Sequence, residues 1–193
     1  DEIVLSAAGT WEGNYVLPAK SGTAADGWIV VRGEFSARLP ALGTRVGPAD
    51  GVLMPKLVTP NTRAALIAAQ SAEGWWVSGL ELTVSPTVIA QQYGILWLGE
   101  GGAPQVTLAT VPTDIVIDRM YIHGHATTNM SRCIALNSAR TQISDSYITE
   151  CHGKGFDSQA ILGWNGPGPY KIVNNLLAGA GENVMFGGAD PAI

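Results

Sequence analysis

A six-residue pattern of apolar and polar positions recurs four times along the chain. Each copy opens on an apolar residue and closes on another apolar residue five positions later. The copies open at Val77, Ile117, Ile143 and Ile172, which are 40, 26 and 29 residues apart. Recurrence at about 20 to 50 residues is typical of solenoid proteins, in which each repeat forms one turn of the chain.

A second pattern of five residues lies between the copies of the first. Its central apolar residues are Ile95, Ile134, Ile161 and Val184, at steps of 39, 27 and 23 residues. The two patterns therefore advance along the chain at nearly the same pace. A solenoid with several strands per coil requires this, because each coil must return a strand to the same face, and an inserted loop lengthens a step without breaking the stack.

The repeated segments have the composition of β-strands. They are short, rich in β-branched and aromatic residues, and bounded by Gly, Asn, Asp and Pro. Residues 62–72 are the best helix candidate, although a strand followed by a turn fits them equally well. We expect Trp75, Trp76 and Trp97, which lie within strand patterns, to serve packing. The prediction is an all-β fold, a right-handed parallel β-helix in which one domain spans residues 1–193.

An antiparallel sandwich or jelly roll is the alternative architecture. It would place tight two-residue turns such as Asn-Gly between adjacent strands. The one Asn-Gly pair, Asn165-Gly166, lies instead in a Pro-rich loop. The β-helix is therefore favoured.

Three segments carry a resemblance to a known superfamily. Residues 1–11 resemble the first coil of pectate-lyase-like right-handed β-helices, including the family 6 polysaccharide lyases. Residues 28–33 resemble the strand that follows, and residues 170–175 resemble a later coil that ends in Asn-Asn. The resemblance implies a secreted, periplasmic or cell-surface protein that handles polysaccharide. It is architectural, however, and no lyase catalytic motif transfers to this chain residue by residue.

Composition narrows the class of protein. Hydrophobic residues make up 46% of the chain and charged residues 14%, which argues against disorder. No apolar run approaches the roughly 20 residues of a membrane helix, and the net charge of −5 argues against a nucleic-acid partner. The chain opens and closes within repeat-like sequence, so we expect it to be a piece of a longer β-helix.

The two cysteines, Cys133 and Cys151, match no zinc-binding spacing. A disulfide between neighbouring coils is one interpretation of them. Two buried free thiols are preferred here, because cysteine packs well as a small apolar residue.

The first pattern aligns three polar residues on successive coils: Arg119, Asp145 and Asn174. Neighbouring strands lie about 4.8 Å apart, which brings each residue within reach of the next. One interpretation is a stacked polar ladder whose members bond to one another. The functional alternative is a site where Arg119 binds a sugar carboxylate through a two-pronged hydrogen bond.

The second pattern aligns Arg132, Gln159 and Glu182, with Asp157 and Lys154 in the adjoining loop. Cleavage of an acidic polysaccharide by elimination needs a neutralised uronate carboxylate and a base. Asp157 and Glu182 are candidate Ca²⁺ ligands, with Arg132 or Lys154 as the neutralising charge or the base. Gln159 is a candidate substrate contact. The competing interpretation is a set of solvated turn residues.

The three histidines all follow strands of the first pattern. Alignment brings the turn that holds His123 and His125 beside the turn that holds His152, which follows Glu150. The cluster is a candidate acid–base or metal site, because imidazole titrates near neutral pH and binds several metals. A plain cluster of turn residues is the alternative.

The loop of residues 164–170 combines Pro, Gly and two aromatic residues. Trp164 and Tyr170 are candidates for a sugar-stacking platform, with Asn165 as a polar contact between them. A stiff loop packed on the solenoid is the alternative.

Two functions follow from these features. The first is a polysaccharide lyase acting on an acidic glycan. It is preferred over a glycoside hydrolase because hydrolysis needs two paired carboxyl groups, and Asp145 and Asp157 are the one weak candidate for such a pair. The second is a non-catalytic glycan-binding or structural module, such as an adhesin or tailspike segment.

Overall fold

A computed structural model describes residues 1–7, 9–179 and 181–193, and its strands form three parallel sheets. Sheet A contains β1 (Glu2–Leu5), β4 (Ile29–Gly33), β7 (Glu73–Ser78), β10 (Thr113–Asp118), β13 (Ala139–Ser144) and β16 (Tyr170–Val173). Sheet B contains β2 (Thr10–Glu12), β5 (Lys56–Thr59), β8 (Glu81–Val84), β11 (Tyr121–His123), β14 (Tyr147–Cys151) and β17 (Leu176–Gly179). Sheet C contains β3 (Tyr15–Leu17), β6 (Leu66–Ala68), β9 (Leu96–Leu98), β12 (Arg132–Leu136), β15 (Gln159–Gly163) and β18 (Glu182–Phe186).

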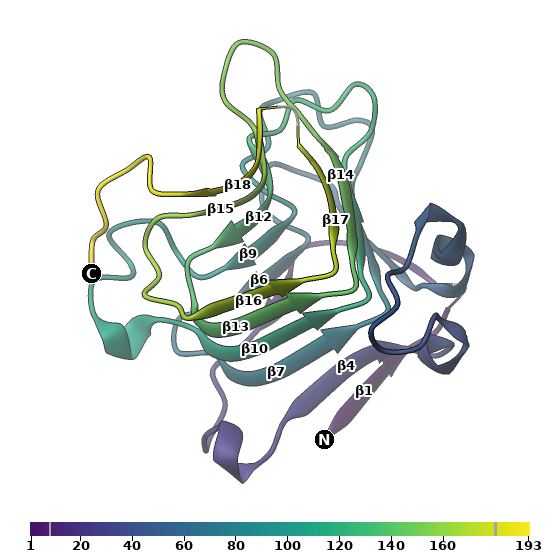
Figure 1. The fold of residues 1–193 in the computed structure, drawn as a ribbon, viewed down its shortest axis with the longest axis horizontal. Helices are drawn as coiled ribbons and strands as arrows, with labels where there is room; N and C mark the ends of the chain where they lie inside the picture. The colour runs from purple at the N-terminus through teal and green to yellow at the C-terminus, as the bar shows by residue number, and fades with distance from the viewer. Residues whose placement is uncertain (8, 180) are drawn as a thin grey trace.

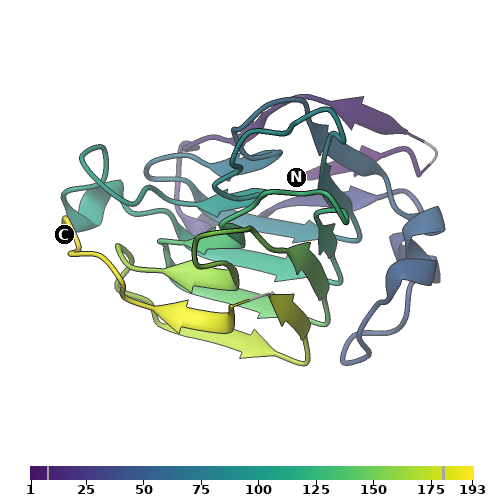
Figure 2. The ribbon, with the colours of Figure 1, turned by 90° about the horizontal axis from the view of Figure 1, so that it is seen from above.

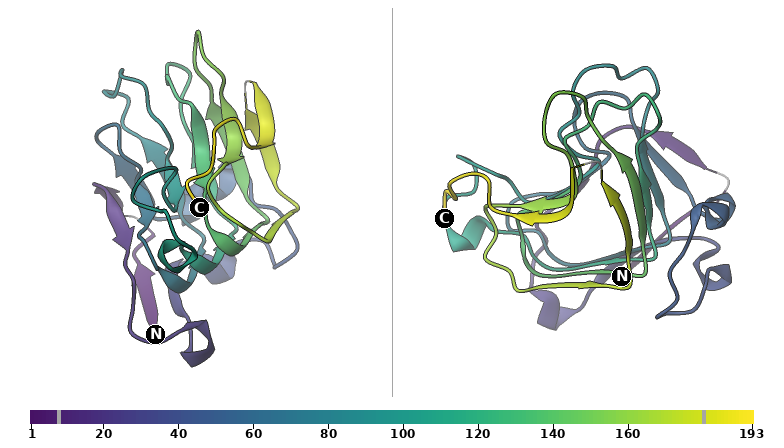
Figure 3. Two further views of the ribbon diagram at one scale, coloured as in Figure 1. Left: turned by 90° about the vertical axis from the view of Figure 1, so that its left-hand side faces the viewer. Right: turned by 45° about the horizontal axis from the view of Figure 1, so that its top comes forward.

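The chain passes through sheets A, B and C in turn and then repeats the circuit, so that β1–β3 form coil 1 and β16–β18 form coil 6 (Figure 1). Every pairing between these strands is parallel. The coils follow one another from the N-terminal to the C-terminal end of the stack (Figure 2). In the right-hand view of Figure 3 the successive coils overlie one another. The predicted parallel β-helix is confirmed, and the antiparallel sandwich is excluded.

The register of sheet A follows the first sequence pattern. Val77, Ile117 and Ile143 are direct partners on neighbouring strands, and Ile143 pairs in turn with Ile172. These side chains point into the solenoid, and the first three are fully buried. Stacking the same apolar position on each coil removes that surface from water, which is the main stabilising contribution of such a core.

The second pattern is right in all but one register. Ile134 pairs with Ile161, and Ile161 with Val184, as predicted. On the other side Ile134 pairs with Leu96 rather than with Ile95. Ile95 and Leu96 are both fully buried, so two consecutive apolar residues hid the alternation that fixes strand register.

Residues 62–72 form no helix. They contain β6 and the turn that follows it, which is the strand-and-turn interpretation left open by the sequence. The helices in the described part of the chain are four short 3-10 segments: Ala24–Asp26, Ser36–Arg38, Pro48–Leu53 and Leu108–Thr110. None of the described helices has the length and apolar character needed to cross a membrane.

The corner between sheets A and B uses the left-handed backbone conformation on four successive coils. Gly79, Arg119, Asp145 and Asn174 have φ values of 67°, 47°, 52° and 54°. Gly, Asn and Asp adopt this conformation at low cost, whereas an arginine there is strained. The corner therefore explains why the first pattern aligns these four positions.

The prediction of two free thiols is wrong, because Cys133 and Cys151 form a disulfide with a Cα–Cα distance of 5.4 Å. Cys133 lies on β12 in coil 4, and Cys151 ends β14 in coil 5. Both side chains point into the core and are fully buried, as predicted. The corner between sheets B and C brings the two cysteines together. Their sequence separation of 18 residues does not reveal where this corner lies, so it did not predict the bond.

Residues 34–55 form an insertion between β4 and β5 that lies beside sheet B (Figure 1, dark blue). Leu39, Val46 and Met54 form a small buried cluster of their own, against which Tyr121 and Tyr147 of sheet B pack. The insertion leaves coil 2 and reaches coil 5, where the Val46 N–H donates to the Asp145 carbonyl oxygen at 3.0 Å. It therefore fastens several coils together from outside.

Candidate functional site

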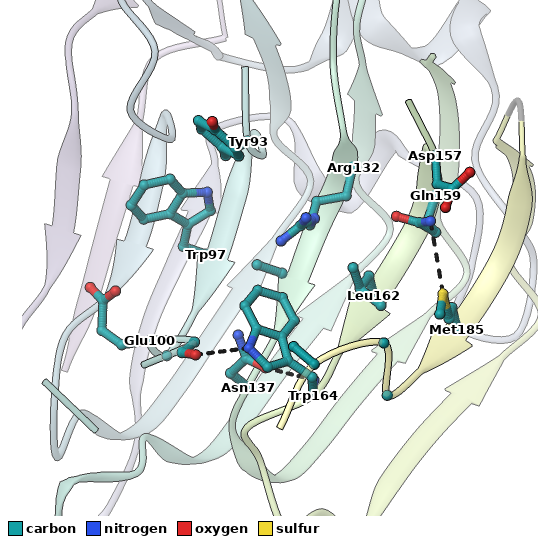
Figure 4. A pocket seen from close by; sticks show the side chains of 16 residues that line it. Tyr93, Trp97, Glu100, Arg132, Asn137, Asp157, Gln159, Leu162, Trp164 and Met185 are labelled. Carbon is teal, nitrogen blue, oxygen red and sulfur yellow. Dashed lines mark hydrogen bonds between the residues drawn. The ribbon is translucent and has the colours of Figure 1, made fainter. Parts of the chain in front are cut away.

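A pocket of about 470 Å³ lies on the outer face of sheet C. It extends over coils 3 to 6, and the loops after β9 and β18 form its walls. Figure 4 shows Arg132 projecting between the indoles of Trp97 and Trp164. The aromatic, polar and charged side chains that line it are those of Tyr93, Trp97, Glu100, Arg132, Asn137, Asp157, Gln159 and Trp164.

The floor of the pocket is an apolar stripe of outward-facing residues. Trp97, Ala135, Leu162 and Met185 are register partners on β9, β12, β15 and β18, and all four line the pocket. The expectation that Trp97 only serves packing is therefore too narrow. The outward position of Trp97 could have been predicted, because Trp97 lies between two leucines that are buried and successive side chains of a strand point to opposite faces.

Arg132 is the central cation of the pocket. Its Cζ lies 4.8 Å from the centroid of the Trp164 ring, which is a cation–π contact. Burial lowers the pKa of the Arg132 guanidinium, and the electrostatic interaction with Tyr93 acts in the opposite direction. Within the described residues, no carboxylate forms an ion pair with Arg132. A partly buried guanidinium without a counter-ion favours an anionic ligand.

Three buried nitrogen atoms of pocket residues have no hydrogen-bond partner among the described residues. They are Trp97 Nε1, Arg132 Nε and Asn137 Nδ2. All three are donors, and buried polar groups in folded proteins are normally paired. Within the described part of the chain, these three donors therefore lack the hydrogen-bond acceptors that buried polar groups normally have.

Two carboxylates also line the pocket, on different sides of Arg132. Glu100 lies in the loop after β9, and Asp157 lies in the loop before β15 (Figure 4). Gln159 lines the pocket between them, and its Nε2 donates to Glu182 Oε2 at 2.7 Å. The predicted alignment of Arg132, Gln159 and Glu182 is confirmed by their register.

Trp164 is the one aromatic residue of its loop that lines the pocket. Its Nε1 donates to the Gly101 carbonyl oxygen at 2.8 Å, which fixes the plane of the indole. The Tyr170 hydroxyl donates to backbone carbonyl oxygens, including Ser138 O at 2.9 Å, and its ring stacks on Phe186. Burial raises the pKa of Tyr170 to about 12, although backbone hydrogen bonding with Gly168 and Ser138 acts in the opposite direction. The predicted platform of two aromatics does not form.

Asn165 is fully buried rather than placed at a ligand. Its Nδ2 donates to the carbonyl oxygens of Glu100 and Gln105, at 3.0 Å each. Its Oδ1 accepts the backbone N–H groups of Ala192 and Ile193. Asn165 therefore joins three segments around the pocket and has no free polar atom for a sugar.

Arg119, Asp145 and Asn174 lie at the corner of sheets A and B, away from the pocket. Asn174 Nδ2 donates to Asp145 Oδ1 at 2.7 Å. Arg119 does not reach Asp145; its Nε bonds to Asp118 Oδ2 at 2.8 Å. Asp145 is buried and also accepts the Gly43 N–H, so it does not share a groove with Asp157. Only the Asp145–Asn174 step of the predicted ladder therefore forms, and Arg119 bonds instead to Asp118 and to Ser78 Oγ.

The histidines lie on sheet B and in the loops that follow it. The turns of His125 and His152 are adjacent, as predicted, because Met130 N donates to His152 O at 2.8 Å. His152 Nε2 lies 3.3 Å from Glu150 Oε2, and His152 and Lys154 line a separate open hollow. His123 lies apart from both and contacts Glu81 instead. The three histidines therefore do not form one cluster, and Lys154 does not line the pocket that contains Arg132.

A cluster of charged residues that joins three coils of sheet B was not predicted from the sequence. Glu81, which is buried, lies 2.7 Å from Lys56 Nζ and 2.8 Å from His123 Nε2. Burial raises the pKa of Glu81, but the hydrogen bonds from His123 and Lys56 outweigh this effect and leave the pKa below 4.5. The pairing of Lys56 with Glu81 on neighbouring strands could have indicated the cluster. The long insertion before β5 prevented this strand from being aligned with β8 in the sequence.

The donor set around Asp157 does not fit Ca²⁺. Calcium takes six to eight oxygen ligands, several of them carboxylates. Across residues 1–7, 9–179 and 181–193, no group of three or more His, Cys, Asp or Glu residues is arranged to hold a metal ion. The Glu182 carboxylate is bonded to Gln159, and the cation Arg132 occupies the same pocket. We therefore assign no metal-dependent step.

Comparison with known proteins adds no relative to this picture. The chain matches no family model, no curated protein and no solved structure.

Proposed function

We propose that the protein is a carbohydrate-active protein of the pectate-lyase-like type that binds an acidic glycan in the pocket on sheet C. The observation that carries the proposal is Arg132, a partly buried cation that has no counter-ion among the described residues and is held against Trp164 above the apolar stripe. A uronate ring has both features that this arrangement favours. Its carboxylate pairs with a guanidinium, and its ring face packs against an indole.

The disulfide between Cys133 and Cys151 supports a location outside the reducing cytoplasm. A secreted, periplasmic or cell-surface protein meets polysaccharides as substrates or as attachment sites. The localisation is part of the proposal and rests on this bond and on the resemblance of the coils.

The reaction that we propose is β-elimination. Arg132 neutralises the uronate carboxylate, which makes the adjacent C5 proton more acidic. A base removes that proton, and the electron pair of the broken C5–H bond forms the C4–C5 double bond. The C4–O bond breaks at the same time, and the leaving oxygen keeps its electron pair and takes a proton from water. Asp157 is the candidate base, because it is a carboxylate that lines the pocket with Arg132.

Glycoside hydrolysis is the second candidate reaction. It is favoured by one observation, that Glu100 and Asp157 both line the pocket from different sides. Hydrolysis uses two carboxyl groups that flank the scissile bond, one as the acid and one as the base or nucleophile. A non-catalytic binding module would use the same aromatic and cationic contacts without either reaction.

One experiment separates these alternatives. The protein is incubated with alginate, pectate and glycosaminoglycans while ultraviolet absorbance, reducing ends and binding are followed. Absorbance from unsaturated products identifies a lyase, reducing ends without absorbance identify a hydrolase, and binding without products identifies the module. Arg132→Gln should abolish the response, whereas Arg45→Gln, which removes an exposed arginine of the insertion, should not. Failure of the wild-type protein to bind any acidic glycan would refute the proposal.

A further inference from the structure

Asn137 directly follows β12 and is buried beneath the pocket, with 1% of its surface exposed. Three of its four polar groups have partners in the protein. Its backbone N–H donates to Leu98 O at 2.8 Å, and its backbone carbonyl accepts from Gln105 Nε2 at 2.8 Å. Its side-chain Oδ1 accepts the backbone N–H groups of Trp164 and Asn165, at 2.9 Å each.

These contacts fix the orientation of the side-chain amide. Both hydrogen bonds at Oδ1 come from backbone N–H groups, which only donate. Turning the amide over would place its NH₂ group against two donors. The NH₂ group of Asn137 is therefore held on the opposite side. Rotating the side-chain amide would break the hydrogen bonds from the Trp164 and Asn165 backbone N–H groups.

The remaining polar group, Nδ2, is buried and has no partner among the described residues. A donor left unpaired in this way destabilises the folded protein, because it has lost its hydrogen bonds to water. Such a donor in a binding pocket is consistent with a ligand that completes its hydrogen bonding. Trp164, which Asn137 positions through its backbone, carries the ring face that lies against Arg132 in the same pocket.

We propose that Asn137 forms a subsite that receives a hydrogen-bond acceptor of the bound sugar, namely a hydroxyl or carboxylate oxygen. The proposal rests on the glycan-binding function and deepens it by defining one contact of the ligand. It assigns Asn137 two roles, because Oδ1 positions the Trp164 wall and Nδ2 binds the sugar. A sugar lacking an acceptor at this point should bind less tightly.

Asn137→Asp is the most informative variant, because it has nearly the same shape. One carboxylate oxygen still accepts the Trp164 and Asn165 N–H groups, while the other replaces the donor with an acceptor. We expect its affinity for an acidic oligosaccharide to fall by about tenfold or more. Asn61→Asp makes the same change of charge at an exposed turn and should leave affinity unchanged.

A direct measurement follows the side-chain NH₂ signal of Asn137 by ¹⁵N NMR in the wild-type protein. Assignment by triple-resonance spectra makes the test independent of whether the variant folds. The probes are an oligouronate and the same oligosaccharide with its carboxyl groups reduced to alcohols. The carboxyl-reduced probe separates loss of the hydrogen bond from charge repulsion in Asn137→Asp.

The expected result is a shift of the Asn137 signal that saturates together with binding. Binding of the oligouronate through Arg132 with an unmoved Asn137 signal would overturn the subsite and leave the proposed function standing. A shift with the reduced probe alone would support the subsite and refute the preference for acidic glycans. A signal that neither probe moves, although both bind, would reject the subsite.

Discussion

His123 Nε2 lies 2.8 Å from Glu81 Oε1, and this contact joins coils 4 and 3 on the outer face of sheet B. Lys56 Nζ approaches the same oxygen from coil 2 at 2.7 Å. Glu81 is buried, so its charge depends on these two partners. The cluster therefore links three successive coils through one carboxylate.

The pKa of Glu81 predicts how this link responds to pH. Because the native pKa lies below 4.5, Glu81 contributes stability that is present above pH 4.5 and is lost as pH falls through the native pKa. The stability difference between wild type and Glu81→Gln should shrink as pH is lowered from about 6 to about 3. Denaturant unfolding at each pH measures it.

Glu12→Gln, at an exposed position of β2, serves as the control for the loss of a carboxylate. Its difference from wild type should stay small throughout the same pH range. A difference for Glu81→Gln that does not vary with pH would contradict the assigned role of Glu81.

The disulfide between Cys133 and Cys151 predicts a redox-dependent stability. It closes a loop with a sequence separation of 18 residues, for which the restriction of the unfolded chain contributes about 3 kcal/mol. The double variant Cys133→Ala/Cys151→Ala should lose about that much in denaturant unfolding. Reductant should destabilise the wild type and leave the variant unchanged, whereas equal responses would indicate that the bond does not form.

Asp145 predicts how firmly the insertion of residues 34–55 is held. Its carboxylate accepts the Gly43 N–H at 2.7 Å, while its backbone carbonyl accepts the Val46 N–H. Asp145→Gly retains the left-handed backbone and removes only the carboxylate. Hydrogen exchange should accelerate at the Gly43 amide more than at the Val46 amide, and unchanged exchange at Gly43 would refute the contact.

The apolar ladder of sheet B predicts a large cost for a cavity. Ile122 is fully buried between its register partners Leu82 and Ile148. Ile122→Ala should lower the free energy of unfolding by about 2–5 kcal/mol. Ile89→Ala makes the same change at a residue that is 85% exposed and should alter stability by less than about 0.5 kcal/mol. Similar costs for the two variants would contradict the assigned core.

Much of the fold could be predicted because stacked coils repeat their apolar positions. The sheet A ladder from Val77 to Ile172 was right in every register. Coils 1 and 2 were not aligned from the pattern, because the insertion of residues 34–55 separates β4 from β5. The one register error, at Ile95, arose where adjacent residues are both buried and periodicity carries no information.

Less of the candidate site was accessible from the sequence. The alignment of Arg132 with Gln159 follows from strand register, which the repeat predicts. Glu100 and Asn137 reach the pocket from loops, and loop paths depend on contacts such as the Asn165 bonds rather than on a repeat. The Cys133–Cys151 bond was considered but not preferred for a similar reason, because a corner between two sheets brings the residues together.

The central claim is that the pocket binds an acidic glycan through Arg132. Calorimetric titration with an oligouronate and with its carboxyl-reduced form, on wild type and Arg132→Gln, tests it most directly. We predict that wild type binds the oligouronate at least about tenfold more tightly than the reduced form, and that Arg132→Gln removes this preference. Equal affinity of the wild-type protein for the two oligosaccharides would contradict the account.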